Sequence, residues 1–249
     1  MQIEDIVYHT VDGQPLLGRL YQPQNAQAAL VEVHGGAWTM NDRLTNAVIH
    51  QHLAANGIAV FSLDFRMAPS HPFPAALEDV NHGIRFLRRR FKRVGGLGTS
   101  SGGYLIVLAA LRADEQTKLE FVVGCWPILD PLARYQMAKA KGLKHLVDAH
   151  HAFFRDQAQM AEANPQLILE RGEPARLPPM LVLQGTGDEN VEHHRADAFA
   201  ERYRAAGGEM ELHKFEGEPH TFVVKDPSST ASKEALAKIT DFVQKEKMS

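Results

Sequence analysis

Two patterns of apolar residues alternate along the chain. Short continuous apolar runs are typical of buried strands, whereas apolar residues that recur every three or four positions are typical of helices. The runs that predict strands lie at 29–36, 57–65, 93–98, 119–127, 178–185 and 210–217. The helical patterns cover 44–56, 76–91, 101–113 and 232–247. A turn sequence, VDGQP, separates two further runs at 6–11 and 16–23, which predicts an opening hairpin.

Strands that alternate with helices of this length predict an α/β fold with a mostly parallel central sheet flanked by helices. Most runs are apolar throughout, as expected of strands that are covered on both faces. We therefore expect a single domain over residues 1–249. Residues 132–176 interrupt the alternation with charged, helix-like segments. Insertions of this kind often cover a site at the strand ends, so we predict a helical lid; ordinary helices beside the sheet are the alternative.

Composition narrows the classes of function. The formal net charge is −3, and the densest basic stretch, Arg85–Arg93, has apolar residues at helical spacing. We interpret it as an amphipathic helix with a solvated face and expect no binding to nucleic acid. Because no run reaches the roughly 18 apolar residues that span a bilayer and the N-terminus lacks a signal-like core, we expect no membrane association and a cytoplasmic protein. A single cysteine, Cys125, excludes an intrachain disulfide.

The stretch GLGTSSGGYL holds two adjacent serines in a predicted strand-to-helix turn. A nucleophile exposed in such a turn leaves little room two residues before and after it, which gives the pattern G-x-S-x-G. Ser100 fits this pattern because Gly98 and Gly102 flank it, whereas Ser101 has Thr99 at the leading position. We predict Ser100 as a nucleophile; a glycine-rich turn without chemistry is the alternative.

A second glycine turn, HGGAW, ends an earlier predicted strand. Acyl transfer develops negative charge on a carbonyl oxygen, and backbone N–H groups fixed in a glycine turn can bind that charge. The expected donors are Gly35 and Gly36, with a third from Ser101, the residue after the nucleophile. A plain strand-end turn is the alternative.

Two further residues have the type and position needed to activate a serine. Asp188 follows a glycine turn after a late strand and can orient a histidine; Glu189 is its competitor, and capping of the next helix is an alternative role. His220 lies after the strand at 210–217, where it can take the proton from Ser100 and return it to a leaving group. The order nucleophile, acid, histidine is that of α/β-hydrolases.

With these motifs the chain resembles the α/β-hydrolase superfamily, and within it the hormone-sensitive-lipase-like esterases. The matching stretches are HGGAW, DFRMAPSHPFPAALEDV, GLGTSSGGYL, LPPMLVLQGTGDENV and EGEPHTF, which lie between Val31 and Phe222. The resemblance implies that Ser100, Asp188 and His220 form a catalytic triad and that the two glycines and Ser101 form an oxyanion hole. It also implies hydrolysis of small-molecule carboxylic esters without a cofactor.

The chain departs from the family pattern at three places. Ala37 stands where a third glycine is common, outside the two donors expected above. Ser70 replaces a glutamate in the stretch that is usually D-Y-R-L-A-P-E, a change expected to remove a structural ion pair but to spare the catalytic residues. Only 33 residues precede His34, fewer than in relatives with a helical N-terminal cap. The insertion at 132–176 is therefore expected to supply most of the cover over the site.

Three functions stay open at this point. The leading one is a serine carboxylesterase that acts on small, short-acyl esters. An arylformamidase similar to kynurenine formamidase is the alternative, because small relatives with HGG-x-W motifs include such amide hydrolases. A non-catalytic ligand-binding protein of the same fold is the third, although such proteins usually lose a triad residue.

No metal site is expected, because the adjacent pairs His150-His151 and His193-His194 lack the i, i+4 spacing of helical metal ligands. Trp38 and Trp126 stand beside motifs at strand ends and are candidate substrate-binding residues; a place in the core is the alternative. A monomer and a homodimer are both compatible with the sequence.

Overall fold

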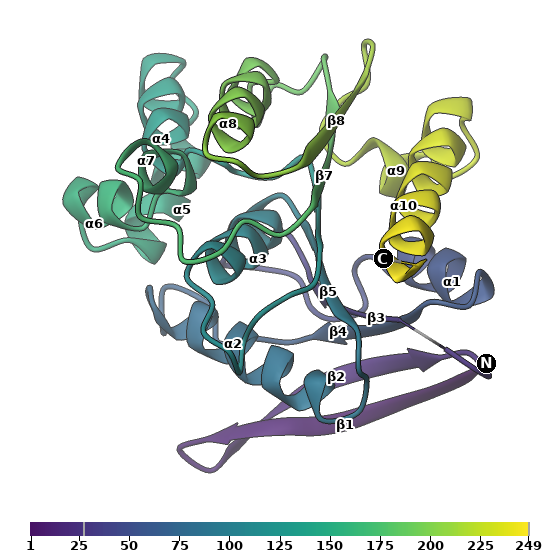
Figure 1. Cartoon of the computed structure of the whole chain (residues 1–249). Coiled ribbons are helices and arrows are strands. Elements are labelled where there is room, and N and C mark those ends of the chain that lie inside the picture. Colours follow the sequence, from purple (N-terminus) through teal and green to yellow (C-terminus); the bar gives the residue numbers. More distant parts are fainter. Residues whose placement is uncertain (27, 249) are drawn as a thin grey trace.

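The computed structural model describes residues 1–26 and 28–248, and one twisted sheet runs through its middle (Figure 1). The strands of this sheet are β1 Gln2–Val11, β2 Gln14–Gln22, β3 Ala29–Val33, β4 Ala59–Leu63, β5 Val94–Thr99, β6 Val122–Cys125, β7 Met180–Gly185 and β8 Met210–Phe215. Their order across the sheet is β1-β2-β4-β3-β5-β6-β7-β8. The predicted hairpin of β1 and β2 is antiparallel, β2 pairs antiparallel with β4, and the strands from β4 to β8 pair in parallel. The predicted α/β-hydrolase fold with a mostly parallel sheet is thus confirmed.

Helices cover both faces of the sheet (Figure 1). They are α1 Ala47–Ala55, α2 Ala75–Arg88, α3 Ser101–Leu111, α4 Pro131–Ala140, α5 Lys144–Phe153, α6 Gln157–Glu162, α7 Pro165–Glu170, α8 His194–Ala205, α9 Phe222–Lys225 and α10 Thr230–Met248. Helices α2, α3 and α8 lie on one face, and α1, α9 and α10 lie on the other. Neighbouring residues of β3 point to opposite faces of the sheet. Val31 packs on the face covered by α2, α3 and α8, and Leu30 packs on the face covered by α1, α9 and α10. Burial on both faces is the reason why the strand runs are apolar throughout.

The insertion between β6 and β7 is helical, with α4 to α7 gathered beside α3 and α8 (Figure 1). Side chains at the helix starts explain why the chain folds this way locally. Asp130, Asp156 and Asn164 each accept a hydrogen bond from a backbone N–H in the first turn of α4, α6 and α7, respectively. That the segment 132–176 acts as a lid stays a prediction.

The apolar helix α3 owes its composition to burial inside the domain. All 11 residues of this helix are buried. Across 1–26 and 28–248, the structure contains no helix whose length and apolar content would let it cross a bilayer.

Close backbone contact at the junction of β5 and α3 requires glycine. A Cβ atom added to Gly102 would lie 2.0 Å from the carbonyl oxygen of Val33, and one added to Gly98 would lie 2.4 Å from the carbonyl oxygen of Gly102. Because both obstacles are backbone atoms, they cannot turn aside as a flexible side chain would. Helix α3 therefore begins directly against the ends of β3 and β5, and Ser100 lies at this junction.

We expect Gly102→Ala to lower the free energy of unfolding by about 3 kcal/mol, because the added methyl group forces the backbones of α3 and β3 apart. Urea unfolding measures the change. The control is Gly57→Ala, where φ is +80° but the space around the added Cβ is open. That variant carries only the backbone penalty of about 1–2 kcal/mol. Equal losses in the two variants would contradict the close contact.

Candidate active site

The predicted motifs meet at one end of the sheet because parallel strands end on the same side. Val33 of β3 is in register with Gly98 of β5, and Gly185 of β7 with Phe215 of β8. The HGGAW turn directly follows β3, Ser100 follows β5, and the loops with Asp188 and His220 follow β7 and β8. Residues from four distant parts of the sequence are thereby placed side by side.

Ser100, His220 and Asp188 lie in one hydrogen-bonded chain. His220 Nε2 is 3.0 Å from Ser100 Oγ, and His220 Nδ1 is 2.7 Å from Asp188 Oδ2. An ionised carboxylate only accepts, so Nδ1–H donates to Asp188 and leaves Nε2 free to accept from the serine hydroxyl. Glu189, the competitor for the acid's role, is exposed and makes no hydrogen bond to the histidine. The arrangement can transfer a proton away from the serine.

The backbone of Ser100 lies in a region that favours glycine, with φ of 52° and ψ of −116°. Three hydrogen bonds hold it there. Its N–H donates to the carbonyl of Cys125 at 3.0 Å, and its own carbonyl accepts from Tyr104 at 3.1 Å and from Ile128 at 3.2 Å. Such strain persists only where the surroundings fix the conformation. The result is a sharp turn that places the Ser100 hydroxyl at the end of a strand, as the G-x-S-x-G pattern predicts.

The Asp188 carboxylate is buried and fully hydrogen-bonded. Oδ1 accepts from the backbone N–H of Asn190 and Val191, both at 2.8 Å, and Oδ2 accepts from Gln184 Nε2 at 3.1 Å as well as from His220. Burial alone would raise the pKa of Asp188, but the hydrogen bond and charge of His220 and the two backbone donors outweigh it, so the pKa lies below its ordinary value. Asp188 is therefore ionised and fixes the ring of the histidine.

The structure corrects one of the expected oxyanion donors. The N–H of Gly35 donates to Thr99 Oγ1 at 2.9 Å and is not available to a ligand. The N–H groups of Gly36 and Ala37 donate no hydrogen bond to any described residue, and both residues line the cavity with the nucleophile. The N–H of Ser101 opens α3 and has no partner within the helix. The open donors are thus Gly36, Ala37 and Ser101, which moves the donor pair one residue along the chain.

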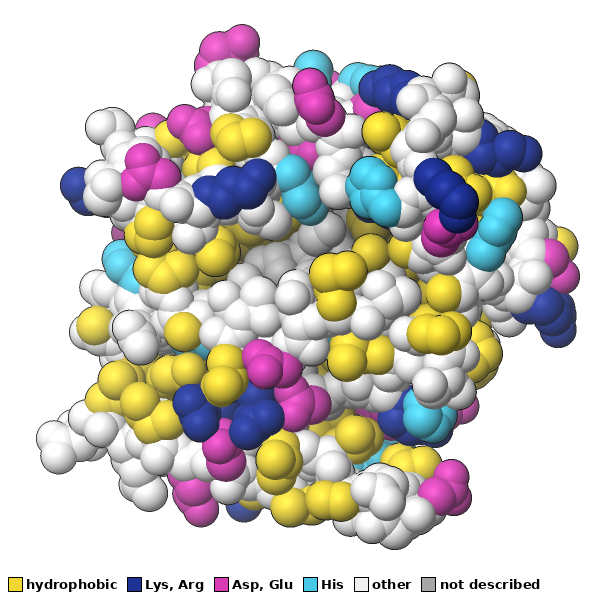
Figure 2. Space-filling view, turned by 180° about the vertical axis from the view of Figure 1, so that it is seen from behind, with side chains coloured by type: hydrophobic (Ala, Val, Ile, Leu, Met, Phe, Trp, Pro, Cys, Tyr) yellow, Lys and Arg dark blue, Asp and Glu magenta, His cyan; other side chains and the backbone are white. Residues whose placement is uncertain are grey.

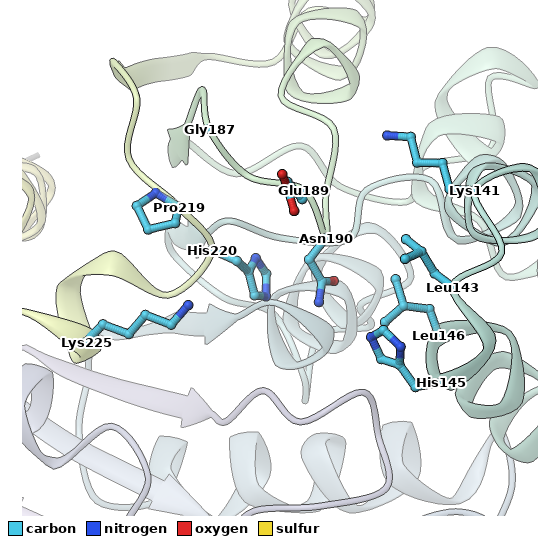
Figure 3. A pocket seen from close by; sticks show the side chains of 10 residues that line it. All are labelled: Lys141, Leu143, His145, Leu146, Gly187, Glu189, Asn190, Pro219, His220 and Lys225. Carbon is cyan, nitrogen blue, oxygen red and sulfur yellow. The ribbon is translucent and has the colours of Figure 1, made fainter.

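Two cavities meet at His220. The smaller, of about 330 Å³, contains Ser100 and the glycine turn, and the larger, of about 760 Å³, shares His220, Asn190, His145 and Leu146 with it but does not include Ser100. The residues that line the larger cavity are Lys141, Leu143, His145, Leu146, Gly187, Glu189, Asn190, Pro219, His220 and Lys225 (Figure 3). In the space-filling view the molecule is hollowed near its middle, and histidine and Lys or Arg side chains border the hollow (Figure 2).

A sequence model of the alpha/beta hydrolase fold matches residues 30–224, a range that includes every residue of the hydrogen-bonded chain. This chain belongs to that family. The resemblance seen in the sequence is thereby confirmed.

Named relatives of this α/β-hydrolase include esterases. It is 29% identical to Esterase LipC of Mycobacterium tuberculosis, over 84% of this chain and 56% of the relative, and 26% identical to Ethyl acetate hydrolase of Pseudomonas putida, over 97% and 82%. The chain spans about half the length of the curated relatives that it matches first. Among solved structures, a Pyrobaculum calidifontis esterase has a TM-score of 0.83 at 22% identity, over 98% of this chain and 85% of that one. Esterase LipW from Mycobacterium marinum has a TM-score of 0.81 at 25% identity, over 98% and 82%.

A buried polar network, which the sequence analysis missed, holds the glycine turn of this α/β-hydrolase. Thr99 Oγ1, the acceptor for Gly35, also accepts from Asn46 Nδ2 at 3.0 Å, and Asn46 Nδ2 lies 2.8 Å from Glu32 Oε1. The other carboxylate oxygen of Glu32 lies 2.9 Å from His50 Nε2 and accepts from Ser62 Oγ at 2.5 Å. We call these five side chains the Glu32 network. They connect strands β3, β4 and β5 with the start of α1 directly beneath the turn.

The Glu32 carboxylate is completely buried. Burial alone would raise its pKa, but the charge of His50 and the hydrogen bonds from His50, Ser62 and Asn46 outweigh it, so the pKa lies below its ordinary value. A signal for this network was present in the sequence, since Glu32 is the one charged residue in the apolar run ALVEV. Its partners on three other elements carried no signal.

The structure places both tryptophans in the core and corrects the prediction that they line the substrate pocket. Trp38 is fully buried and stacks on Phe153 of α5, with ring centroids 4.5 Å apart. Trp126 is also buried and packs edge-on against Phe222 of α9 at 5.4 Å. Neither residue lines the two cavities. Each joins a strand-end loop to a helix that borders the site.

The lowered pKa of Asp188 predicts how stability depends on pH. A depressed pKa stabilises the fold above about pH 4, and this stabilisation is lost as the pH falls through the folded-state value. We therefore expect the difference in unfolding free energy between the wild type and Asp188→Asn to narrow as the pH is lowered from about 5 to about 2. Urea unfolding over this range, with Asp241→Asn on the exposed side of α10 as control, measures it. A difference that stays constant would contradict the assignment.

We expect Thr99→Val to lower the free energy of unfolding by about 2–4 kcal/mol, because it leaves the buried N–H of Gly35 and a donor of Asn46 without an acceptor. Thr99→Ser keeps the hydroxyl and is expected to lose less than about 1 kcal/mol. Urea unfolding of the two variants measures the difference. Equal losses would show that the hydroxyl does not hold the turn.

Proposed function

We propose that this protein is a serine carboxylesterase that hydrolyses small carboxylic esters with a short acyl group. The observation that carries the proposal is the 3.0 Å contact between His220 Nε2 and Ser100 Oγ, next to the open N–H groups of Gly36, Ala37 and Ser101. The printed names of similar proteins, among them esterases and an ethyl acetate hydrolase, support an ester as the bond that is cleaved.

In the first half of the reaction, Ser100 Oγ attacks the ester carbonyl carbon while His220 Nε2 takes the hydroxyl proton. Asp188 stabilises the positive charge that forms on the imidazole. The carbonyl oxygen becomes negatively charged and accepts hydrogen bonds from the three open N–H groups, which need no reorganisation to bind it. His220 then returns the proton to the alcohol oxygen, the carbon–oxygen bond breaks, and an acyl-serine remains.

In the second half, a water molecule takes the place of the alcohol. His220 Nε2 accepts a proton from this water as its oxygen attacks the acyl carbon, and the same N–H groups bind the second oxyanion. Return of the proton to Ser100 Oγ releases the carboxylic acid and regenerates the enzyme. The cavity of about 330 Å³ beside Ser100 favours a short acyl group in both steps.

We expect Ser100→Ala to lower kcat for p-nitrophenyl acetate by about 10⁶-fold, because the nucleophile is lost while the fold stays intact. Ser101→Ala is the matched variant at the adjacent serine. It keeps the backbone N–H and loses only the hydroxyl that accepts from the N–H of Trp38 at 3.3 Å, so we expect a loss of about tenfold at most. Circular dichroism verifies the fold of both. Full activity in folded Ser100→Ala would disprove the assignment.

Acyl length tests the substrate class. With p-nitrophenyl esters of increasing acyl length, we expect kcat/KM to fall as the chain outgrows the smaller cavity. An N-formyl aryl amide is assayed in parallel. Hydrolysis of that amide without hydrolysis of any ester would replace the esterase by an arylformamidase. Failure with both classes, together with failure of a fluorophosphonate to label Ser100, would favour a ligand-binding protein.

A further inference from the structure

His220 lines both cavities, so an ester bound at Ser100 can extend into each of them. The alcohol oxygen must come within hydrogen-bond reach of His220 Nε2 to receive its proton. The smaller cavity contains Ser100, Gly36 and Ala37, whereas the larger one includes His220 but not Ser100. We therefore assign the acyl group to the smaller cavity and the alcohol part to the larger one.

The walls of the larger cavity carry more positive than negative charge. Lys225 at the end of α9 and Lys141 directly after α4 lie on opposite sides of it, with His220, Asn190 and Glu189 between them (Figure 3). Lys141 forms an ion pair with Glu192 at 3.3 Å, but Lys225 has no carboxylate within ion-pair distance among the described residues. Of the described residues that line either cavity, Glu189 is the only acid.

A third cation, Arg134 of α4, lines the smaller cavity and is 5% exposed. Its Nε donates to the carbonyl oxygen of Asn190 at 3.1 Å and its Nη2 to Asn190 Oδ1, so both partners are neutral, and the buried Nη1 has no partner among the described residues. Burial lowers the pKa of Arg134 to about 10, against the opposing charge of Asp188, so the guanidinium stays charged at neutral pH. The charge of this buried side chain is screened less than a charge in open solvent, whereas Lys141 and Lys225 are exposed.

We propose that the alcohol part of the preferred ester carries an anionic group, a carboxylate or a phosphate, which the larger cavity binds through Lys225 and Lys141. The inference rests on the proposed esterase function and names its substrate class. The net charge of the chain is −3, so the positive cavity opposes the sign of the whole molecule. A cleft lined by one sign of charge attracts and orients a substrate of the other sign.

Four acetyl esters that differ only in the group para to the ester oxygen test the inference: 4-acetoxybenzoate, 4-acetoxyphenyl phosphate, the neutral 4-acetoxybenzamide and the cationic 4-acetoxyphenyl-trimethylammonium. Each kcat/KM is divided by the rate of hydrolysis by hydroxide, which corrects for leaving-group reactivity. At low salt we expect the anionic esters to exceed the neutral one by about tenfold. The excess should shrink as NaCl is raised from about 20 to about 500 mM.

Two charge-removing variants locate the effect. We expect Lys225→Gln to lower the ratio of anionic to neutral kcat/KM by about two- to fivefold, the range of one exposed ion pair. Lys92→Gln is the matched control, because Lys92 is exposed and lies just before β5, at the opposite end of the strands. It should leave the ratio unchanged.

The outcomes separate the two proposals. Preference for either anion supports the inference, and the larger preference identifies the group. A ratio of one, a preference for the cationic ester, or a ratio that neither salt nor Lys225→Gln changes would overturn it while the esterase assignment stands. Failure to hydrolyse any of the four esters would overturn the proposed function, and the inference with it.

Discussion

A left-handed backbone at a residue that is not glycine, Ser100, sets the geometry of the site. Its φ of 52° is maintained because Gly98 and Gly102 let α3 start in contact with the strand ends. Each residue of the tripeptide Thr99-Ser100-Ser101 then has a separate task. The hydroxyl of Thr99 fixes the glycine turn, that of Ser100 faces His220, and that of Ser101 accepts from the N–H of Trp38. The hydroxyl groups of the two adjacent serines thus face different partners, because the chain turns sharply at Ser100.

The Glu32 network holds the glycine turn with little net gain in stability. A buried carboxylate loses several kcal/mol of hydration, on the order of what a well-formed set of hydrogen bonds returns. Glu32 receives hydrogen bonds from three side chains, and one of these, Asn46, also reaches Thr99. Asn46 and His50 make these contacts from the start of α1, so the network ties α1 to the sheet. The Thr99 hydroxyl that accepts from Asn46 also accepts from the N–H of Gly35. The network therefore fixes the direction of the neighbouring open N–H groups of the turn.

Motif spacing predicted the elements and the three residues of the hydrogen-bonded chain, because each lies directly after a strand and parallel strands end together. It could not predict which N–H groups of the glycine turn are free. That depends on a contact between Gly35 and Thr99, 64 positions apart, and so the choice of Gly35 over Ala37 was wrong. The prediction that the two tryptophans bind substrate failed for a related reason. Proximity to a motif places a residue near the site but does not say whether its side chain faces the cavity or the core.

The burial of Trp38 shows how the two layers of the site are connected. The sheet end supplies Ser100, His220 and the open N–H groups of the glycine turn, whereas the insertion supplies Arg134, Lys141, His145 and Leu146 on the cavity walls. Trp38 stacks on Phe153 of that insertion and belongs to the glycine turn. The glycine turn and α5 are therefore in direct contact through one aromatic pair. The cavity walls from the insertion and the polar groups at the sheet end are packed against each other, although they come from different parts of the fold.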